Sequence, residues 1–223
     1  MGSERKSMII SEEEKRITAY HEAGHALIAA LEKEADPLHK VSIIPRGMAL
    51  GVTQQLPLND KYTYSKSYLE AQLSVLLAGR VSEEIFLAMT TTGAGHDFER
   101  ATSIARKMVC EWGMSALGPI TFAKKEDMIF LGRDLMSHNE YSEETSQMID
   151  KEIKKIIDQA YANSRRIIMD NRENLETIAL QLLEKESLTS EDIAAILGMR
   201  KKADRAPSRK QKLRNGQPLP AAK

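Results

Sequence analysis

The sequence predicts a mainly α fold of the α+β class, with one small β-sheet or hairpin near residues 41–56 and a C-terminal helical bundle. Apolar residues recur at helical spacing along several long segments, which is typical of amphipathic helices. Two short β-prone runs flank a Pro-Arg-Gly turn, as in a hairpin. The chain has 223 residues, 42% of them hydrophobic, enough for one core with appendages.

The first helix is expected from Ser11 to Glu34. Ser11 and Glu14 have the spacing of a capping box, in which each side chain accepts a backbone N–H at the helix start. Residues at helical spacing then form its inner stripe: Ile17, Tyr20, Gly24, Leu27, Ile28 and Leu31. The helix should end at Asp36-Pro37, because proline disfavours a helical residue before it.

Strands are expected at 41–44 and 51–56, joined through the turn at 45–47. A second helix, from about residue 65 to 87, follows from six apolar residues at helical spacing: Leu69, Leu73, Leu76, Leu77, Val81 and Ile85. Thr90–Gly95 breaks this pattern, since its two glycines do not favour a helix. A third helix is expected over 97–111.

The remaining chain is expected to be irregular over 112–139, with a short β segment at 120–122, and then helical. A long helix should span 142–169, a second should start at the cap Asn171, and a short one should open at Thr189 and close at Gly198. Residues 1–10 are interpreted as a linker, 11–198 as the folded domain, and 199–223 as a disordered basic tail.

Composition argues against several classes of protein. Lys and Arg together number 32, as do Asp and Glu, so no net charge favours nucleic acid or an anionic membrane. The single cysteine, Cys110, excludes an internal disulfide. No apolar run approaches the roughly 18 residues needed to cross a bilayer, so the chain as given is expected to be soluble.

The stretch His21-Glu22-Ala23-Gly24-His25 puts two imidazoles and a carboxylate into one helical turn. Residues four apart share a helix face, so His21 and His25 can bind one metal ion while Glu22 lies beside it. Zinc bound in this way keeps a position for water and lowers its pKa, and a carboxylate can take the proton. This pattern indicates a zinc peptidase, with Glu22 as the catalytic base.

A catalytic zinc site needs a third protein ligand. Asp97 follows a Gly-Ala-Gly loop that permits close backbone approach, although an aspartate there is also a good helix N-cap. His96 is adjacent and offers an imidazole. Glu83 and Glu84 lie on the preceding helix. Spacing alone leaves these alternatives open, with Asp97 modestly favoured.

Several further motifs follow in order: Thr18–Ala26, Val41–Gly51, Gly79-Arg80 with Glu83-Glu84, Thr91–Ala94 with Asp97, Gly113-Met114 and Leu182–Glu186. Together they resemble the zinc peptidase domain of the FtsH family of membrane-anchored AAA+ proteases, from about residue 4 to about residue 198. This resemblance implies that His21, His25 and Asp97 bind Zn²⁺ and that Glu22 is the base. A glutamate of the pair 83–84 remains a less favoured ligand.

The resemblance also implies a biological setting. It implies a zinc-dependent endopeptidase that degrades unfolded or damaged membrane and soluble proteins as a homohexamer. The chain contains no phosphate-binding loop, so the ATP-binding domain and the membrane anchor are expected before Met1. The full-length protein would then lie at the cytoplasmic face of the bacterial inner membrane, or at an organellar membrane. We expect no nucleic-acid partner.

Three residues depart from the family's pattern. Ala78 and Ala88 stand where glycine is common, and His96 stands where asparagine is frequent. An imidazole beside Asp97 could support the ligand, replace it or donate to the transition state.

Two further hypotheses concern substrate and function. Residues 48–53 could form an edge strand that pairs with an extended substrate. A protein of another class, a catalytically silent helical oligomerisation module, would carry the same helices without bound metal.

Overall fold

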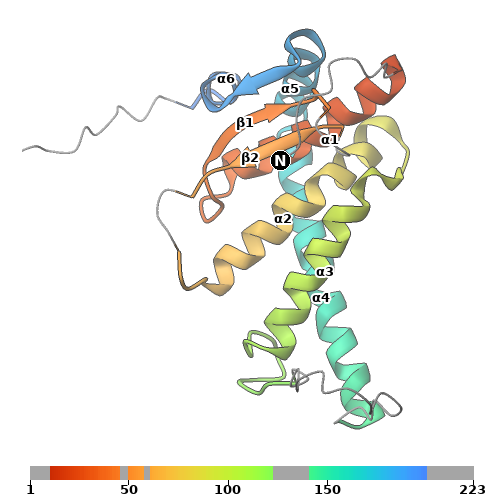
Figure 1. Ribbon diagram of the computed structural model, residues 1–223, viewed down its shortest axis with the longest axis vertical. Coiled ribbons are helices and arrows are strands. Elements are labelled where there is room, and N and C mark those ends of the chain that lie inside the picture. Colours follow the sequence, from red (N-terminus) through yellow and green to blue (C-terminus); the bar gives the residue numbers. More distant parts are fainter. Residues whose placement is uncertain (1–10, 46–49, 58–60, 123–140, 200–223) are drawn as a thin grey trace, which may run out of the picture.

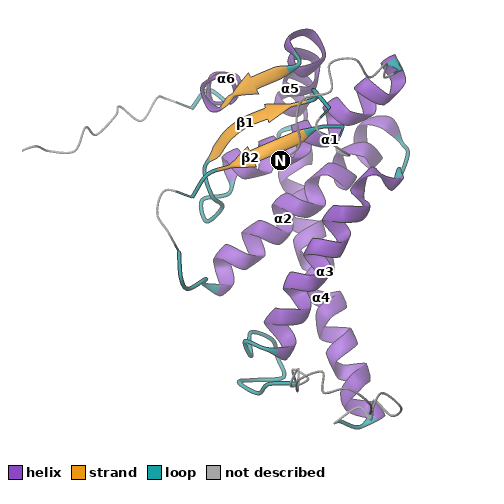
Figure 2. Cartoon of the chain, in the orientation of Figure 1, coloured by secondary structure: helices purple, strands orange, loops and turns teal. Residues whose placement is uncertain are grey.

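The computed structural model describes residues 11–45, 50–57, 61–122 and 141–199. These residues form helices and a small sheet (Figure 2): α1 (Glu12–Leu31), β1 (Leu38–Ser42), β2 (Val52–Gln55), α2 (Lys66–Ser82), the π-helical turn η1 (Glu83–Leu87), the 3₁₀ turn η2 (Thr92–Ala94), α3 (Gly95–Cys110), α4 (Glu143–Asp170), α5 (Arg172–Lys185), β3 (Ser187–Thr189) and α6 (Ser190–Ile196). The predicted mainly α fold with one small sheet is confirmed. The predicted linker and nearly all of the predicted tail lie outside the described residues.

The start of α1 has the predicted capping box. The Ser11 hydroxyl accepts a hydrogen bond from the Glu14 backbone at 3.2 Å, and the Glu14 carboxylate accepts one from the Ser11 backbone at 3.3 Å. The Thr189 hydroxyl and the Asp192 carboxylate form a second box at the start of α6. Both boxes satisfy backbone donors that a helix start leaves free. The first fixes where the helix carrying the two histidines begins.

The sheet has the order β2-β1-β3, with antiparallel pairing throughout. Val41 lies opposite Thr53 on one side and Leu188 on the other. Directly opposed residues point to the same face of a sheet, and Val41 and Leu188 are buried in the core. The third strand was not predicted, because three residues between two helices are too few to show alternation. Among the described residues, β2 therefore lies at one edge of the sheet and pairs with β1 alone.

Two hydrophobic clusters hold the helices together. One joins α1, α5 and the sheet, and the other joins α2, α3 and α4. Figure 1 shows α3 and α4 running side by side away from the sheet, with α2 between them and α1. The C-terminal helices thus pack onto the N-terminal ones, and segments far apart in sequence share each core. No helix among the described residues is both long and apolar enough to cross a bilayer.

The β segment predicted at 120–122 is wrong. The Phe122 backbone donates to the Cys110 carbonyl at 2.7 Å, and the Thr121 hydroxyl donates to the same oxygen at 3.1 Å. These donors close the last turn of α3, where helical carbonyls lack intrahelical partners. The segment therefore lies against a helix end, and it pairs with no strand among the residues that the structure describes.

Helices α1 and α2 approach closely at Gly24. A Cβ atom there would lie 2.6 Å from the Ala78 carbonyl oxygen and would also collide with the Ser82 hydroxyl. The mid-helix glycine therefore has a packing reason, as its helix propensity suggested. Ala78, one of the departures from the family's pattern, is fully buried at this contact.

The other alanine that departs from the family's pattern, Ala88, has an unfavourable backbone conformation. Ala88 follows η1 with φ 51° and ψ 32°, in the left-handed region that glycine adopts freely. Ala88 is also exposed, so its methyl group gains little from burial.

We predict that Ala88→Gly raises the free energy of unfolding by about 0.5–1 kcal/mol, because it relieves the left-handed strain by more than the flexibility it adds to the unfolded chain. Denaturant unfolding followed by circular dichroism measures the change. The matched control is Ala162→Gly at an exposed position inside α4, which should lower stability by about 1 kcal/mol. Equal destabilisation by both variants would contradict the prediction.

Candidate active site

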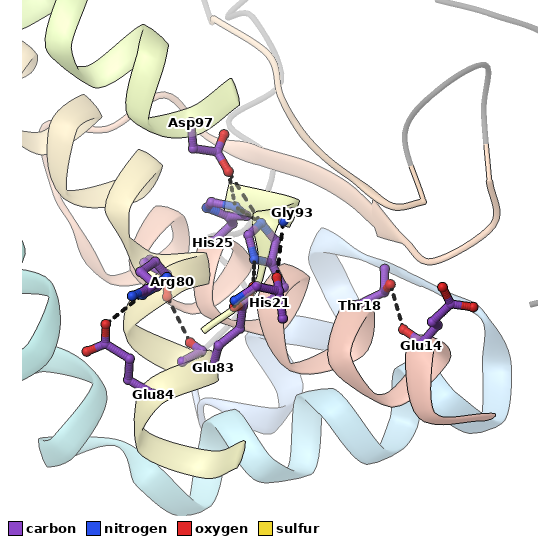
Figure 3. A network of polar contacts seen from close by, with 12 residues as sticks. Glu14, Thr18, His21, His25, Arg80, Glu83, Glu84, Gly93 and Asp97 are labelled. Atoms are coloured by element: carbon purple, nitrogen blue, oxygen red, sulfur yellow. Dashed lines mark hydrogen bonds and ion pairs between the residues drawn. The ribbon is translucent and has the colours of Figure 1, made fainter. Parts of the chain in front are cut away.

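The two histidines of the motif lie one turn apart on α1 and point to the same place. Their Nε2 atoms are 3.0 Å apart, and both side chains are largely buried, with 12% and 10% exposed for His21 and His25. Figure 3 shows the two rings meeting below the first turn of α3. The helical spacing therefore produces the convergence that the sequence predicted.

Asp97 completes this group from another helix. It lies in the first turn of α3, after η2, and its Oδ2 atom is 3.3 Å from each Nε2 atom. Within the described parts of the chain, His21, His25 and Asp97 are the group of side chains that could hold a metal ion, with ligand atoms within 4.8 Å of one another. Figure 3 shows the Asp97 carboxylate directed at both imidazoles.

The opposite nitrogen of each imidazole has its own hydrogen-bond partner. His21 Nδ1 lies 2.7 Å from the Glu83 carboxylate, and His25 Nδ1 lies 2.7 Å from the Val75 carbonyl oxygen. Both partners are acceptors, so the Nδ1 atoms carry the protons and donate. In a neutral ring the lone pair is then on Nε2, beside the Asp97 carboxylate.

This donor set fits a zinc ion. When both rings are neutral, three acceptor atoms converge here, and a cation, either a metal ion or a proton, relieves their mutual repulsion. Zn–N and Zn–O bonds of about 2.0–2.1 Å in a tetrahedron separate neighbouring ligand atoms by about 3.3–3.4 Å, close to the 3.0–3.3 Å distances here. The Nδ1 partners are those that orient metal-binding imidazoles in proteins.

The electrostatics of the three side chains agree with this requirement. Burial alone lowers the pKa of His21, but its hydrogen bonds to Asp97 and Glu83 outweigh burial and raise this pKa to about 10. Burial alone raises the pKa of Asp97, but hydrogen bonds from both histidines hold it well below its usual range. When no metal ion is bound, His21 therefore holds a proton, and this proton supplies the positive charge beside the carboxylates.

The candidate base, Glu22, faces the sheet from the same turn of α1. Its side chain is buried, and the Thr53 hydroxyl on β2 donates to its Oε2 atom at 2.6 Å. Gly51 lies against the same carboxylate, because a Cβ atom there would be 2.5 Å from Oε1. A buried carboxylate with one strong donor stays available as an acceptor.

The alternative ligands have other surroundings. Glu84 receives hydrogen bonds from Arg80, at 2.6 Å, and from the Tyr161 hydroxyl. Glu83 contacts His21 on the ring side that faces away from Asp97. His96 is exposed and does not belong to the converging group.

Glu83 also connects the two parts of the site. It is fully buried, and its second oxygen accepts a hydrogen bond from the Thr91 backbone at 3.0 Å. Burial alone would raise the pKa of Glu83, but the hydrogen bond from His21 holds this pKa below its usual range. One carboxylate thus orients a candidate ligand and fixes the loop that leads to Asp97.

Some site residues could not be recognised from the sequence. Val75 contributes a backbone carbonyl, which leaves no mark on residue type. The Thr53 hydroxyl gave a weak signal, since it lies in the segment proposed as an edge strand. Gly79 was part of a motif, and its role is now visible: a Cβ atom there would lie 2.5–2.7 Å from three atoms of the His21 ring.

Comparison with known proteins agrees with this geometry. The family model described as peptidase family M41 matches residues 8–196. The ATP-dependent zinc metalloprotease FtsH of Acidobacterium capsulatum is 58% identical over 197 residues, which cover 88% of this chain and 31% of the relative. FtsH 4 of Sorangium cellulosum is 54% identical (90% and 31% covered), and FtsH of Magnetococcus marinus is 50% identical (88% and 29% covered). The chain spans about a third of these relatives' length.

We predict that Gly79→Ala lowers zinc affinity at least tenfold, because the added methyl group pushes the His21 ring out of line with Asp97. Competition with a chromogenic chelator measures the affinity, and circular dichroism checks the fold. Gly95→Ala is the matched control, since a Cβ atom there meets nothing within 4 Å. The prediction fails if both variants bind zinc like the unaltered chain.

Proposed function

This chain belongs to peptidase family M41, and from this membership and the geometry of the site we propose that it hydrolyses peptide bonds as a zinc-dependent endopeptidase. The single observation that carries the proposal is the convergence of two imidazole nitrogens and one carboxylate oxygen beside a buried carboxylate. His21, His25 and Asp97 would hold the ion through Nε2, Nε2 and Oδ2. Bound zinc supplies a water of lowered pKa and polarises the scissile carbonyl.

Glu22 acts as the general base in this proposal. Its carboxylate takes a proton from the water whose oxygen attacks the carbonyl carbon. When the C–N bond breaks, Glu22 passes that proton to the leaving amine, and the carboxylate is restored. The Nδ1–H groups of His21 and His25 keep donating to the Glu83 carboxylate and the Val75 carbonyl throughout, so neither ring rotates between steps.

The substrate in this proposal is an extended polypeptide that pairs with the outer edge of β2. Support comes from the sheet order, in which β2 lies at an edge of the part of the sheet that the structure describes, and from the position of β2 beside Glu22. Pairing of this kind recognises main-chain groups, so it imposes little side-chain specificity. Part of the segment expected to form this edge, residues 46–49, lies outside the described residues.

The longer protein is proposed to work as its relatives' names suggest. The three relatives above are named ATP-dependent, and this chain covers about a third of each. We propose that an ATPase domain preceding the chain delivers unfolded or damaged membrane and soluble proteins to the zinc site. A homohexamer, anchored through N-terminal segments at the cytoplasmic face of a bacterial inner membrane, is the proposed assembly, without nucleic acid.

Glu22→Gln should abolish cleavage of fluorescein-labelled casein, with a decrease of at least about 100-fold, while zinc content stays at the wild-type level. Glutamine keeps the shape of the side chain but cannot take a proton. Zinc is measured by atomic absorption on the same samples. Glu13→Gln, an exposed position on the same helix, is the control and should keep full activity. Full activity in Glu22→Gln would exclude this mechanism.

Asp97→Ala should lose most of its zinc on dialysis, because only two protein ligands remain. The neighbouring variant His96→Ala should keep near-stoichiometric zinc, since His96 is exposed and outside the converging group. The opposite result, with zinc lost only in His96→Ala, would transfer the ligand role to His96. A wild-type chain that binds no metal would favour the silent oligomerisation module.

A further inference from the structure

The edge strand β2 contacts the candidate base directly. The Thr53 hydroxyl lies 2.6 Å from Glu22 Oε2 and 3.4 Å from the Glu22 backbone carbonyl. An ionised carboxylate can only accept, so the hydroxyl is the donor in the short contact. Hydrogen bonds from neutral donors to a carboxylate are among the stronger ones in proteins, and this one lies in a buried part of the site.

The register of the sheet places Thr53 where it can make this contact. Thr53 lies opposite Val41, and Val41 is completely buried on the side of the sheet that faces α1. Because the side-chain period of a strand is two, a slip of one residue would turn Thr53 to the other face. The pairing of β1 with β2 therefore determines where the hydroxyl lies.

Gly51 restricts the same carboxylate from a second direction. A Cβ atom at this position would lie 2.5 Å from Oε1, 2.7 Å from Cγ and 2.9 Å from Cδ of Glu22. Glycine thus lets the backbone just before β2 lie directly against the carboxylate. The Glu22 carboxylate therefore has the Thr53 hydroxyl as a donor to Oε2 and the Gly51 backbone packed beside Oε1.

We propose that Thr53 is a positioning residue for the reaction: its hydroxyl holds Oε2 of Glu22 so that the carboxylate keeps one orientation and the other oxygen exchanges the proton. This inference rests on the proposed peptidase function. Strand β2 would then have two roles: its edge would pair with the substrate, and its Thr53 would orient Glu22. A substrate peptide seated on β2 is then in a set relation to Glu22.

Steady-state cleavage of a fluorogenic peptide by the zinc-loaded chain tests the role of Thr53. Thr53→Val replaces the hydroxyl by a methyl group of similar size and should lower kcat about tenfold or more. KM should stay within about twofold, and zinc content should be unchanged. Thr53→Ser restores a hydroxyl and should recover most of kcat. A purely structural role for Thr53 predicts that valine, which keeps the β-branched shape, preserves kcat better than serine.

The matched control is Thr18→Val on the same helix as Glu22. Thr18 is buried and donates its hydroxyl to the Glu14 carbonyl at 2.8 Å, so the variant removes a comparable hydrogen bond away from the base. It should leave kcat unchanged. Figure 3 shows Thr18 and Glu14 apart from the converging ligands.

Glu22→Gln, assayed beside these variants, separates this inference from the proposed function. If Glu22→Gln keeps activity, the proposed mechanism fails. If Glu22→Gln is inactive but Thr53→Val keeps wild-type kcat, or if serine and valine lower kcat equally, the positioning role is overturned. If Thr53→Val does not fold, Thr53→Ser and Thr53→Ala make the same comparison of a retained with a lost hydroxyl.

Discussion

The close contact between α1 and α2 is the constraint on which the rest of the site depends. At Gly24 the Ala78 carbonyl would be 2.6 Å from a Cβ atom, and at Gly79 the His21 ring occupies the space of a side chain. The backbone of α2 thus forms one wall of the site, and its Val75 carbonyl orients His25. Had either glycine carried a side chain, the helices would separate and both imidazoles would lose their alignment.

Charge balance is the second organising feature. Three carboxylates, those of Glu22, Glu83 and Asp97, surround two imidazoles in a largely buried volume. Buried charges are costly unless they are paired, and each of these has a specific partner: Thr53, His21 or both histidines. The remaining excess of negative charge favours a divalent cation at the point where the ligand atoms meet.

The parts of the fold encoded locally could be predicted from the sequence. The capping box at Ser11, the spacing of His21 and His25, and the helical stripes depend on residues within a few positions of one another. The third ligand could not be predicted from spacing alone, which favoured Asp97 only modestly over the other candidates. The resemblance to a family singled out Asp97. Strand β3 and the contacts of Val75 and Gly79 arise from long-range packing between helices, which residue type does not reveal. The segment 120–122 was misassigned because its β-branched and aromatic residues favour strands, whereas its hydrogen bonds go to the end of α3.

The hydrogen bond between Glu83 and the Thr91 backbone has a consequence for the order of folding and metal uptake. It ties the loop before α3 to the helix pair without using the metal-binding atoms, so departure of the ion removes only one of the links between Asp97 and α1. The empty site should then persist as a preformed receptor instead of collapsing. Zinc would then bind to a loop that is already in place, and uptake of the ion would not have to wait for that loop to fold.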